Sequence, residues 1–485
     1  MINLKTIYRV LGSLLMIEAL LMMCCAAMAF YYGEDDTLAF AITVIMTMTA
    51  AFTLQQLGRD ADNYMSRRDA YLVVTLSWIT FSAFGTLPFL ISGYITNIAS
   101  AFFETMSGFT TTGATIIDDV EALPHGLLFW RSMTQWIGGL GIVFFTIAIL
   151  PSFVGGSVRV FAAEATGPIK TRLHPRLSTN AKWIWSIYLI LTVGCILSFW
   201  GAGMSLFDSV NYAMGTTATG GFSTHNASME FFHSPLIEYL GTLFCFLSGI
   251  NFTLLYTSFV KLKPTSLWKN TEFKFYLTMA VGFTLFIMFE LMLHNGYDLE
   301  KAFRSASFEV VSFMTTTGLF NDDAGKWPHV TWVVLAACMF FGGCSGSTSG
   351  GFKSIRGVML LKVIKNEFTQ LLHPNAVLSM KIDGNNVPQQ QRVTLLAFLT
   401  VYLTICLVAS FLLIASGIDN TNAITIILSC IGNVGPTLGL EIGPTMSWSE
   451  LPDYIKWLCS FLMLIGRLEI FSVLVIFTPT FWKER

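Results

Sequence analysis

The stretch Thr110-Thr111-Thr112-Gly113 has three counterparts further along the chain. Each follows a short apolar segment of about 12–15 residues and precedes a longer one. Four such stretches in the same hydropathic position, at roughly one-domain intervals, indicate one structural unit used four times, although a single Thr-Gly pair would mean little. The counterparts are Ala218-Thr219-Gly220-Gly221, Thr315-Thr316-Thr317-Gly318 and Asn433-Val434-Gly435-Pro436.

The composition is that of a membrane protein. Of the 485 residues, 54% are hydrophobic and only 12% are charged, whereas soluble domains are about 25% charged. Many apolar runs reach the ~20 residues that a helix needs to cross a bilayer. The net charge of -2 gives no indication of a nucleic-acid partner. Nine cysteines without paired spacing argue against a disulfide framework or a zinc site.

The apolar segments predict an all-α polytopic protein with four parallel repeats around a central pore, preceded by two extra helices. Each repeat is expected to contain a span, a half-helix and a second span. The second span is expected to run unbroken over 236–260 in unit two and over 453–480 in unit four, which gives ten full spans in all. The expected boundaries are 1–60 for the amino-terminal pair, then 70–155, 180–262, 272–372 and 391–482 for units one to four.

The distribution of basic residues predicts the orientation in the membrane. One of the 28 lysines and arginines, Arg467, lies within a span, and 22 lie on the side that contains both chain ends. Both termini are therefore expected in the cytoplasm, and the four Thr-Gly stretches in the outer half of the membrane. The five basic residues on the outer side are Arg131, Lys301, Arg304, Lys326 and Lys456.

Four half-helices that end together would suit a cation. Their last carbonyl groups have no partners within the helix and carry the negative end of the helix dipole. A row of carbonyls facing one axis needs alternating backbone conformations, which glycine supplies through positive φ. The stretches contain no carboxylate, so an oxygen cage there favours a large monovalent cation over calcium or magnesium.

The repeated order of span, half-helix, Thr-x-Gly turn and span resembles the Trk/Ktr/HKT superfamily of potassium transporters. Gly466-Arg467-Leu468-Glu469 and the Gly/Ser-rich break at Gly342–Gly351 strengthen the likeness. Within the superfamily, the chain is most similar to the TrkH family of bacterial potassium-uptake subunits, over roughly residues 70–485. The amino-terminal pair is also a feature of that family. The resemblance implies a transported potassium ion, no other cofactor, no enzymatic activity and a location in the cell inner membrane.

The resemblance also implies a selectivity filter. In unit two, the spacing from the half-helix allows either Gly220 or Gly221 as the filter glycine, and the preceding Thr219 favours Gly220. Unit four departs from the pattern with Asn433 and Val434, which puts full four-fold equivalence in doubt. The implied potassium-binding residues are Thr111, Thr112, Gly113, Ala218, Thr219, Gly220, Thr316, Thr317, Gly318, Asn433, Val434 and Gly435.

Two further elements follow from the resemblance. Gly342–Gly351 resembles an intramembrane gate loop, and the alternative is an ordinary loop outside the membrane. Arg467 resembles a buried barrier to free cation flow, and the alternative is a salt bridge with Glu469 or another acid. Glu104, Glu290 and Glu309 could carry protons, but we expect them instead to brace half-helices or to lie at interfaces. The gate-loop residues are Gly343, Cys344, Ser345, Gly346, Ser347, Thr348, Ser349 and Gly350.

The family likeness implies a homodimer that pairs with a cytoplasmic, nucleotide-binding TrkA-type subunit. It leaves open whether transport is passive or coupled, as in a symport with protons or sodium. An alternating-access carrier of small solutes would be built from inverted repeats, but the repeats here are parallel. A membrane-embedded enzyme would need His, Asp or Glu side chains clustered at one depth, and the spans contain no such cluster.

Overall fold

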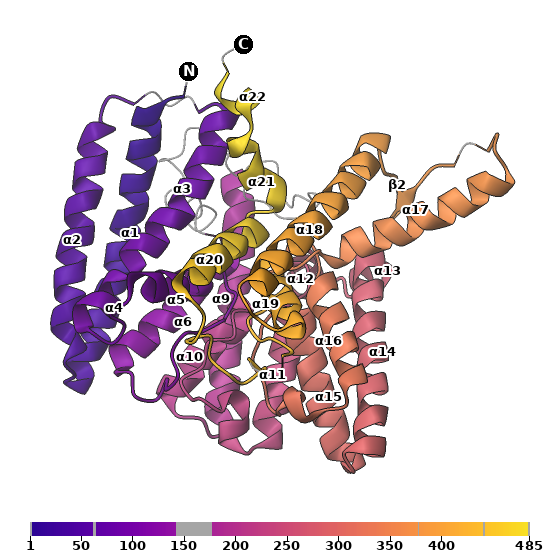
Figure 1. The fold of residues 1–485 in the computed structure, drawn as a ribbon, viewed down its shortest axis with the longest axis horizontal. Coiled ribbons are helices and arrows are strands. Elements are labelled where there is room, and N and C mark those ends of the chain that lie inside the picture. Colours follow the sequence, from indigo (N-terminus) through magenta and orange to yellow (C-terminus); the bar gives the residue numbers. More distant parts are fainter. Residues whose placement is uncertain (1, 62–64, 142–176, 377, 440–441, 484–485) are drawn as a thin grey trace.

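A computed structural model describes residues 2–61, 65–141, 177–376, 378–439 and 442–483. Nearly all the regular structure is helical, and the helices stand side by side (Figure 1). The exception among these residues is a two-residue hairpin of β1 (Lys381–Ile382) and β2 (Asn385–Asn386). The guanidinium of Arg68 donates to the carbonyl of Lys483, 2.8 Å away, near the carboxyl end. The predicted basic loop after unit one, and the end of its second span, lie outside the described residues.

The amino-terminal pair consists of α1 (Leu4–Tyr32) and α2 (Asp36–Leu57). Gly33 ends α1 with a φ of 70°, a left-handed conformation that glycine adopts without strain. Two acidic side chains attach the pair to unit one. Glu34 accepts a hydrogen bond of 2.6 Å from the His125 N–H, and Asp36 accepts one of 3.1 Å from the Leu127 N–H.

The predicted half-helices are present in all four units. The shortest has 12 residues and is about 18 Å long at 1.5 Å per residue, which is too short to cross ~30 Å of hydrocarbon. Polar residues cap three of them at the amino end: the side chains of Asn97, Ser205 and Asp419 accept hydrogen bonds from the first-turn N–H groups. The half-helices are α5 (Ile98–Phe109), α10 (Leu206–Ala218), α15 (Leu299–Met314) and α19 (Asn420–Gly432).

Each half-helix is preceded by the long first helix of its unit. These helices are apolar along most of their length, as a lipid-facing span must be. The first begins with a capping box in which Ser66 and Asp69 exchange hydrogen bonds with each other's backbone N–H groups. The first helices are α3 (Arg67–Gly85) continued by α4 (Leu87–Ser92), then α9 (Leu177–Gly201), α14 (Thr271–His294) and α18 (Gln389–Ala415).

The second helices of units two and four are shorter than predicted. Among the described residues, six helices are long and apolar enough to span a membrane, and eight if each bent pair counts as one span, compared with the ten expected. The third-unit break after α16 is present, and the chain resumes there as α17 (Ser354–Leu372). The second helices are α6 (His125–Leu140), α11 (Pro235–Ser248), α16 (His329–Phe341) and α20 (Asp453–Arg467).

The prediction of unbroken second spans in units two and four is wrong. The chain bends by 101° after α11 and by 113° after α20. At the first bend, the Asn251 side chain caps a new helix by accepting from the N–H groups of Thr253 and Leu254. At the second bend, Glu469 adopts a φ of 58°, which a helix cannot accommodate. The new segments are α12 (Phe252–Leu255) with η2 (Tyr256–Val260), and α21 (Ile470–Leu474) with η4 (Val475–Phe477).

Short helical turns complete the connections between these elements. Two connect a half-helix to the second helix of its own unit, one links units two and three, and one lies at the carboxyl end; none is long enough to cross a membrane. They are η1 (Ser228–Phe232), α13 (Thr265–Lys269), η3 (Ala324–Lys326) and α22 (Pro479–Trp482).

Candidate ion-binding ring and the loop beneath it

The backbone alternates in handedness at the end of every half-helix. One residue has a φ of 53–58°, the next has an ordinary φ, and a glycine follows with a φ of 77–101°. Alternation of this kind turns successive carbonyl groups to the same side, as the sequence analysis expected for an oxygen-lined path. The first left-handed residues are Thr111, Thr219, Thr316 and Asn433, and the glycines are Gly113, Gly221, Gly318 and Gly435.

A shared hydrogen bond fixes the register of the four stretches. The N–H of the residue before each glycine donates to the carbonyl five residues earlier, at 2.8–3.0 Å. In unit two the donor is Gly220. The four donor–acceptor pairs are Thr112–Ser107, Gly220–Gly215, Thr317–Ser312 and Val434–Ser429.

This register corrects the choice of Gly220 as the filter glycine of unit two. Gly221 has the positive φ and the position of Gly113, whereas Gly220 corresponds to Thr112. The predicted Ala218 moves out of the set, because it corresponds to Thr110. In the sequence, Thr219 directly precedes a glycine and so resembles Thr112. Its left-handed φ shows that it corresponds to Thr111 instead.

The four stretches form a closed ring. A Cβ atom on Gly113 would overlap the carbonyl oxygen of Gly220, and one on Gly221 would overlap that of Thr317. Each glycine therefore lies against the next unit, and the last lies against the first. The two remaining contacts pair Gly318 with the Val434 oxygen and Gly435 with the Thr112 oxygen.

The ring opens into a cavity that is lined by all four glycines. This geometry confirms that the four stretches meet around one axis. Glycine is required at each position for two reasons, because the φ is left-handed and because a neighbouring carbonyl occupies the space of a side chain.

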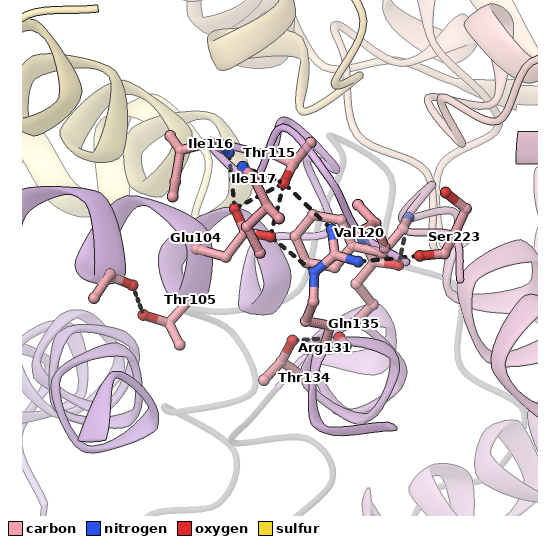
Figure 2. A network of polar contacts seen from close by, with 12 residues as sticks. Glu104, Thr105, Thr115, Ile116, Ile117, Val120, Arg131, Thr134, Gln135 and Ser223 are labelled. Carbon is pink, nitrogen blue, oxygen red and sulfur yellow. Dashed lines mark hydrogen bonds and ion pairs between the residues drawn. The ribbon is translucent and has the colours of Figure 1, made fainter. Parts of the chain in front are cut away.

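A buried ion pair supports the ring at unit one (Figure 2). Arg131 Nε donates to Glu104 Oε1 at 2.9 Å, and Glu104 Oε2 accepts from the Ile116 N–H at 3.0 Å. The same guanidinium donates to the Ser223 carbonyl of unit two at 3.0 Å. Both charged side chains are at most 2% exposed. Arg131 thus joins its own half-helix to the segment that leaves the neighbouring stretch.

Glu309 takes the corresponding place in unit three. Glu104 and Glu309 each stand nine residues before the glycine of their stretch, and Glu309 accepts a hydrogen bond of 3.1 Å from the Asn321 N–H. These contacts agree with the bracing expected of Glu104 and Glu309. Glu290 lies on α14, where its Oε2 is 3.2 Å from His294 Nδ1.

The Gly/Ser loop, Gly342–Gly351, packs directly against the ring. The Gly350 N–H donates to Thr316 Oγ1 at 2.7 Å, and Thr348 Oγ1 donates to the Thr217 carbonyl at 3.1 Å. Cys344, Thr348 and Ser349 are each about 1% exposed. The loop is buried against units two, three and four, which does not fit the alternative of an ordinary solvent-exposed loop.

Arg467 ties this loop to unit one. Its guanidinium donates to the Thr348 carbonyl at 2.7 Å and to the carbonyls of Gly138 and Gly139 at 2.6 and 2.7 Å. Glu469, the predicted alternative partner, forms an ion pair with Arg356.

A second, narrow pocket lies against the Gly/Ser loop. It is lined by loop residues 349–351 together with four charged side chains. Three of them, Lys353, Arg356 and Arg467, are cationic, and only Glu469 is anionic. Sequence analysis singled out Arg467 alone, because Lys353 and Arg356 appeared to lie on an ordinary cytoplasmic helix.

A half-buried histidine stands near the outer mouth. His225 Nε2 is 3.5 Å from Asp208 Oδ1, and Nδ1 is 3.4 Å from Glu121 Oε1. Burial lowers the pKa of His225, but the two carboxylates outweigh it and hold that pKa above its ordinary value. In the part of the chain that the structure describes, no group of three His, Cys, Asp or Glu side chains could hold a metal ion.

Comparison with known proteins decides the family. The family model described as "TrkH: Cation transport protein" matches residues 37–484. The chain belongs to the TrkH family. The family consists of transport proteins, which confirms the prediction of a transporter and not an enzyme.

TrkH relatives match the chain along its whole length. It is 36% identical to the Trk system potassium uptake protein TrkH of Escherichia coli K12, over 99% of this chain and 100% of that protein. It is 33% identical to TrkG of the same organism, over 99% of this chain and 99% of TrkG. The crystal structure of the potassium transporter TrkH from Vibrio parahaemolyticus superposes with a TM-score of 0.89, at 35% identity and 99% coverage of both chains.

The Glu104–Arg131 pair generates a stability prediction. Arg131→Met removes the cation and leaves a buried carboxylate without its countercharge, so we expect the free energy of unfolding to fall by about 3–5 kcal/mol. The measurement is unfolding of the detergent-solubilised protein followed by tryptophan fluorescence.

A matched control is Lys5→Gln, which breaks the exposed Lys5–Asp60 pair at 4.0 Å. That change should cost less than about 1 kcal/mol. Equal stability of Arg131→Met and the unsubstituted protein would contradict the bracing role.

Proposed function

We propose that this protein takes up potassium across a bacterial inner membrane, and that the ring of four Thr-Gly stretches is its selectivity filter. The observation that carries the proposal is the closed ring of left-handed glycines, each against a carbonyl of the next unit. Its TrkH-family relatives are named for potassium uptake. Potassium is the cargo, and no other cofactor is part of the proposal.

The filter would replace the water around a potassium ion with main-chain oxygens. Its carbonyl groups come from four equivalent positions, so an ion on the axis would meet oxygen from every unit. The proposed filter residues are Thr111, Thr112, Gly113, Thr219, Gly220, Gly221, Thr316, Thr317, Gly318, Asn433, Val434 and Gly435. The units that supply them are proposed to span 70–155, 180–262, 272–372 and 391–482.

The Gly/Ser loop would act as a gate below this filter. It contacts Thr316 and Thr217 and lines the second pocket, so an ion that leaves the ring on that side would meet it. Arg467 holds the loop through Thr348 and lines the second pocket, where its charge would oppose free cation flow. Opening would require the Thr348 carbonyl to leave the guanidinium.

The membrane arrangement and partners are part of the same proposal. The basic residues favour cytoplasmic termini, and both chain ends lie at the same end of the helices (Figure 1). We further propose a homodimer with a TrkA-type nucleotide-binding subunit on the cytoplasmic side, in keeping with the family. Rubidium uptake into liposomes that contain the purified protein, with and without a proton gradient, tests the function and separates passive conduction from symport.

Gly113→Ser tests the filter. The serine side chain would overlap the Gly220 carbonyl and would be strained at a φ of 83°. We expect the potassium-to-sodium selectivity of uptake to fall by about tenfold or more. A displaced carbonyl that changes the difference in binding free energy between the two ions by roughly 1.4 kcal/mol changes their binding ratio tenfold. The measurement is competition between rubidium and sodium in liposomes.

Gly417→Ser is the matched control for backbone strain. Gly417 has a φ of 91° but no atom within 4 Å of where a Cβ would lie, and it precedes α19, at the end of that half-helix away from the ring. It should leave selectivity unchanged. Normal discrimination by Gly113→Ser in a folded protein would remove Gly113 from the filter.

Deletion of Ser345–Ser349 tests the gate. If the loop obstructs the path, we expect uptake by the folded variant to rise several-fold, because the obstruction and the Thr348–Arg467 contact are both lost. Size-exclusion chromatography checks the fold of the variant. Unchanged or lower flux through a monodisperse protein would contradict gating by this loop.

A further inference from the structure

Gln135 on α6 holds the filter stretch of unit two with both ends of its carboxamide. Its Nε2 donates to the Gly220 carbonyl at 2.6 Å, and its Oε1 accepts from the Phe222 N–H at 3.1 Å. The side chain is fully buried. Because a backbone N–H can only donate, the Phe222 contact fixes the orientation of the amide and turns its NH2 group toward Gly220.

The Gly220 carbonyl is one of the four that form the ring, so this contact breaks the four-fold symmetry. Elsewhere in the described residues, no side chain donates a hydrogen bond to the ring carbonyls of Thr112, Thr317 or Val434. The helices that follow the half-helices explain the difference. Counted from the first residue of each helix, the eleventh is Gln135 in α6, Cys245 in α11, Met339 in α16 and Met463 in α20.

The contact between α11 and unit three shows that the eleventh residue of a second helix faces the residue before the ring glycine of the next unit. The Cys245 thiol interacts with the Thr317 side chain. Thr317 is the unit-three equivalent of Gly220, because each directly precedes the ring glycine of its unit. Cysteine and methionine carry no N–H group. Only α6, of these four helices, therefore presents an amide donor to the ring.

The Gln135 carboxamide occupies the space that a side chain on residue 220 would fill. A Cβ atom on Gly220 would overlap the Gln135 carboxamide. Gly220 does not have a left-handed φ, so backbone conformation does not require glycine there. The missing side chain instead makes room for the amide. This explains why unit two has Gly-Gly where the other units have Thr-Gly or Val-Gly.

We propose that Gln135 is a positioning residue that weakens the Gly220 carbonyl as an ion ligand and so sets the affinity of the filter. The proposal rests on the proposed function. The amide takes up one of the two lone pairs of the oxygen and brings the positive end of an N–H dipole toward the ion path. Unit two then binds the ion less strongly than its three neighbours. Weaker binding favours release, since a conducting site must not hold its ion too firmly.

The first test is Gln135→Met, which gives α6 the residue that α16 and α20 carry. Rubidium uptake into liposomes is measured over a range of rubidium concentrations. Release of one hydrogen bond should lower KM by about three- to tenfold and lower the maximal rate. Loss of a merely structural contact would not tighten binding, so an unchanged or raised KM would overturn the proposal.

Met339→Leu is the matched control, because it makes a volume-conserving change at the same helix position without altering any donor. It should leave KM within twofold of the unsubstituted value. If the unsubstituted protein itself shows no potassium-competed rubidium uptake, the proposed function fails. If it does and Gln135→Met keeps the same KM, only the role of Gln135 fails.

The second test exploits the steric match. Gly220→Thr alone should abolish uptake, because the new side chain overlaps Gln135. The double variant Gln135→Cys/Gly220→Thr rebuilds in unit two the Cys245–Thr317 arrangement of unit three, and we expect it to recover uptake with a KM below that of the unsubstituted protein. A double variant no more active than Gly220→Thr would contradict the match.

Discussion

The structure depends on the close approach of four glycines to carbonyl oxygens of neighbouring units. At Gly113, Gly221, Gly318 and Gly435, the space that a side chain would fill is taken by main-chain oxygen from the next stretch. The left-handed backbone excludes most other residues independently. Together these constraints bring four segments, about a hundred residues apart in the chain, to within contact of one axis.

A ring of irregular backbone in a membrane must be supported by protein on every side. Each stretch returns an N–H to its own half-helix, and Glu104, Arg131 and Glu309 tie down the segments that leave the ring. From below, the Gly/Ser loop fills the remaining space and is anchored by Arg467. These charged side chains are buried because they form hydrogen bonds with backbone N–H and C=O groups, which lipid could not form.

Because the four units belong to one chain, their sequences can differ, and each unit can carry different functional residues. Unit one supplies Gln135 and an ion pair, and unit two supplies the Gly220 that accommodates the amide. Unit three is broken by the loop, and unit four carries Arg467. A homotetramer would have to repeat each of these features four times around the axis. Internal duplication instead allows one loop and one arginine, while the glycines stay equivalent.

The sequence by itself determined the half-helices, the glycines of units one, three and four, and the Gly/Ser break in unit three. These depend on hydropathy, helix caps and local composition, which neighbouring residues in the chain decide. Tertiary structure decided between Gly220 and Gly221, because only the folded chain shows which of the two has the left-handed φ and lies against the carbonyl of the next unit. It also decided the bends after α11 and α20 and the position of Gln135 against unit two. Such contacts join residues of different units, and no local pattern specifies them.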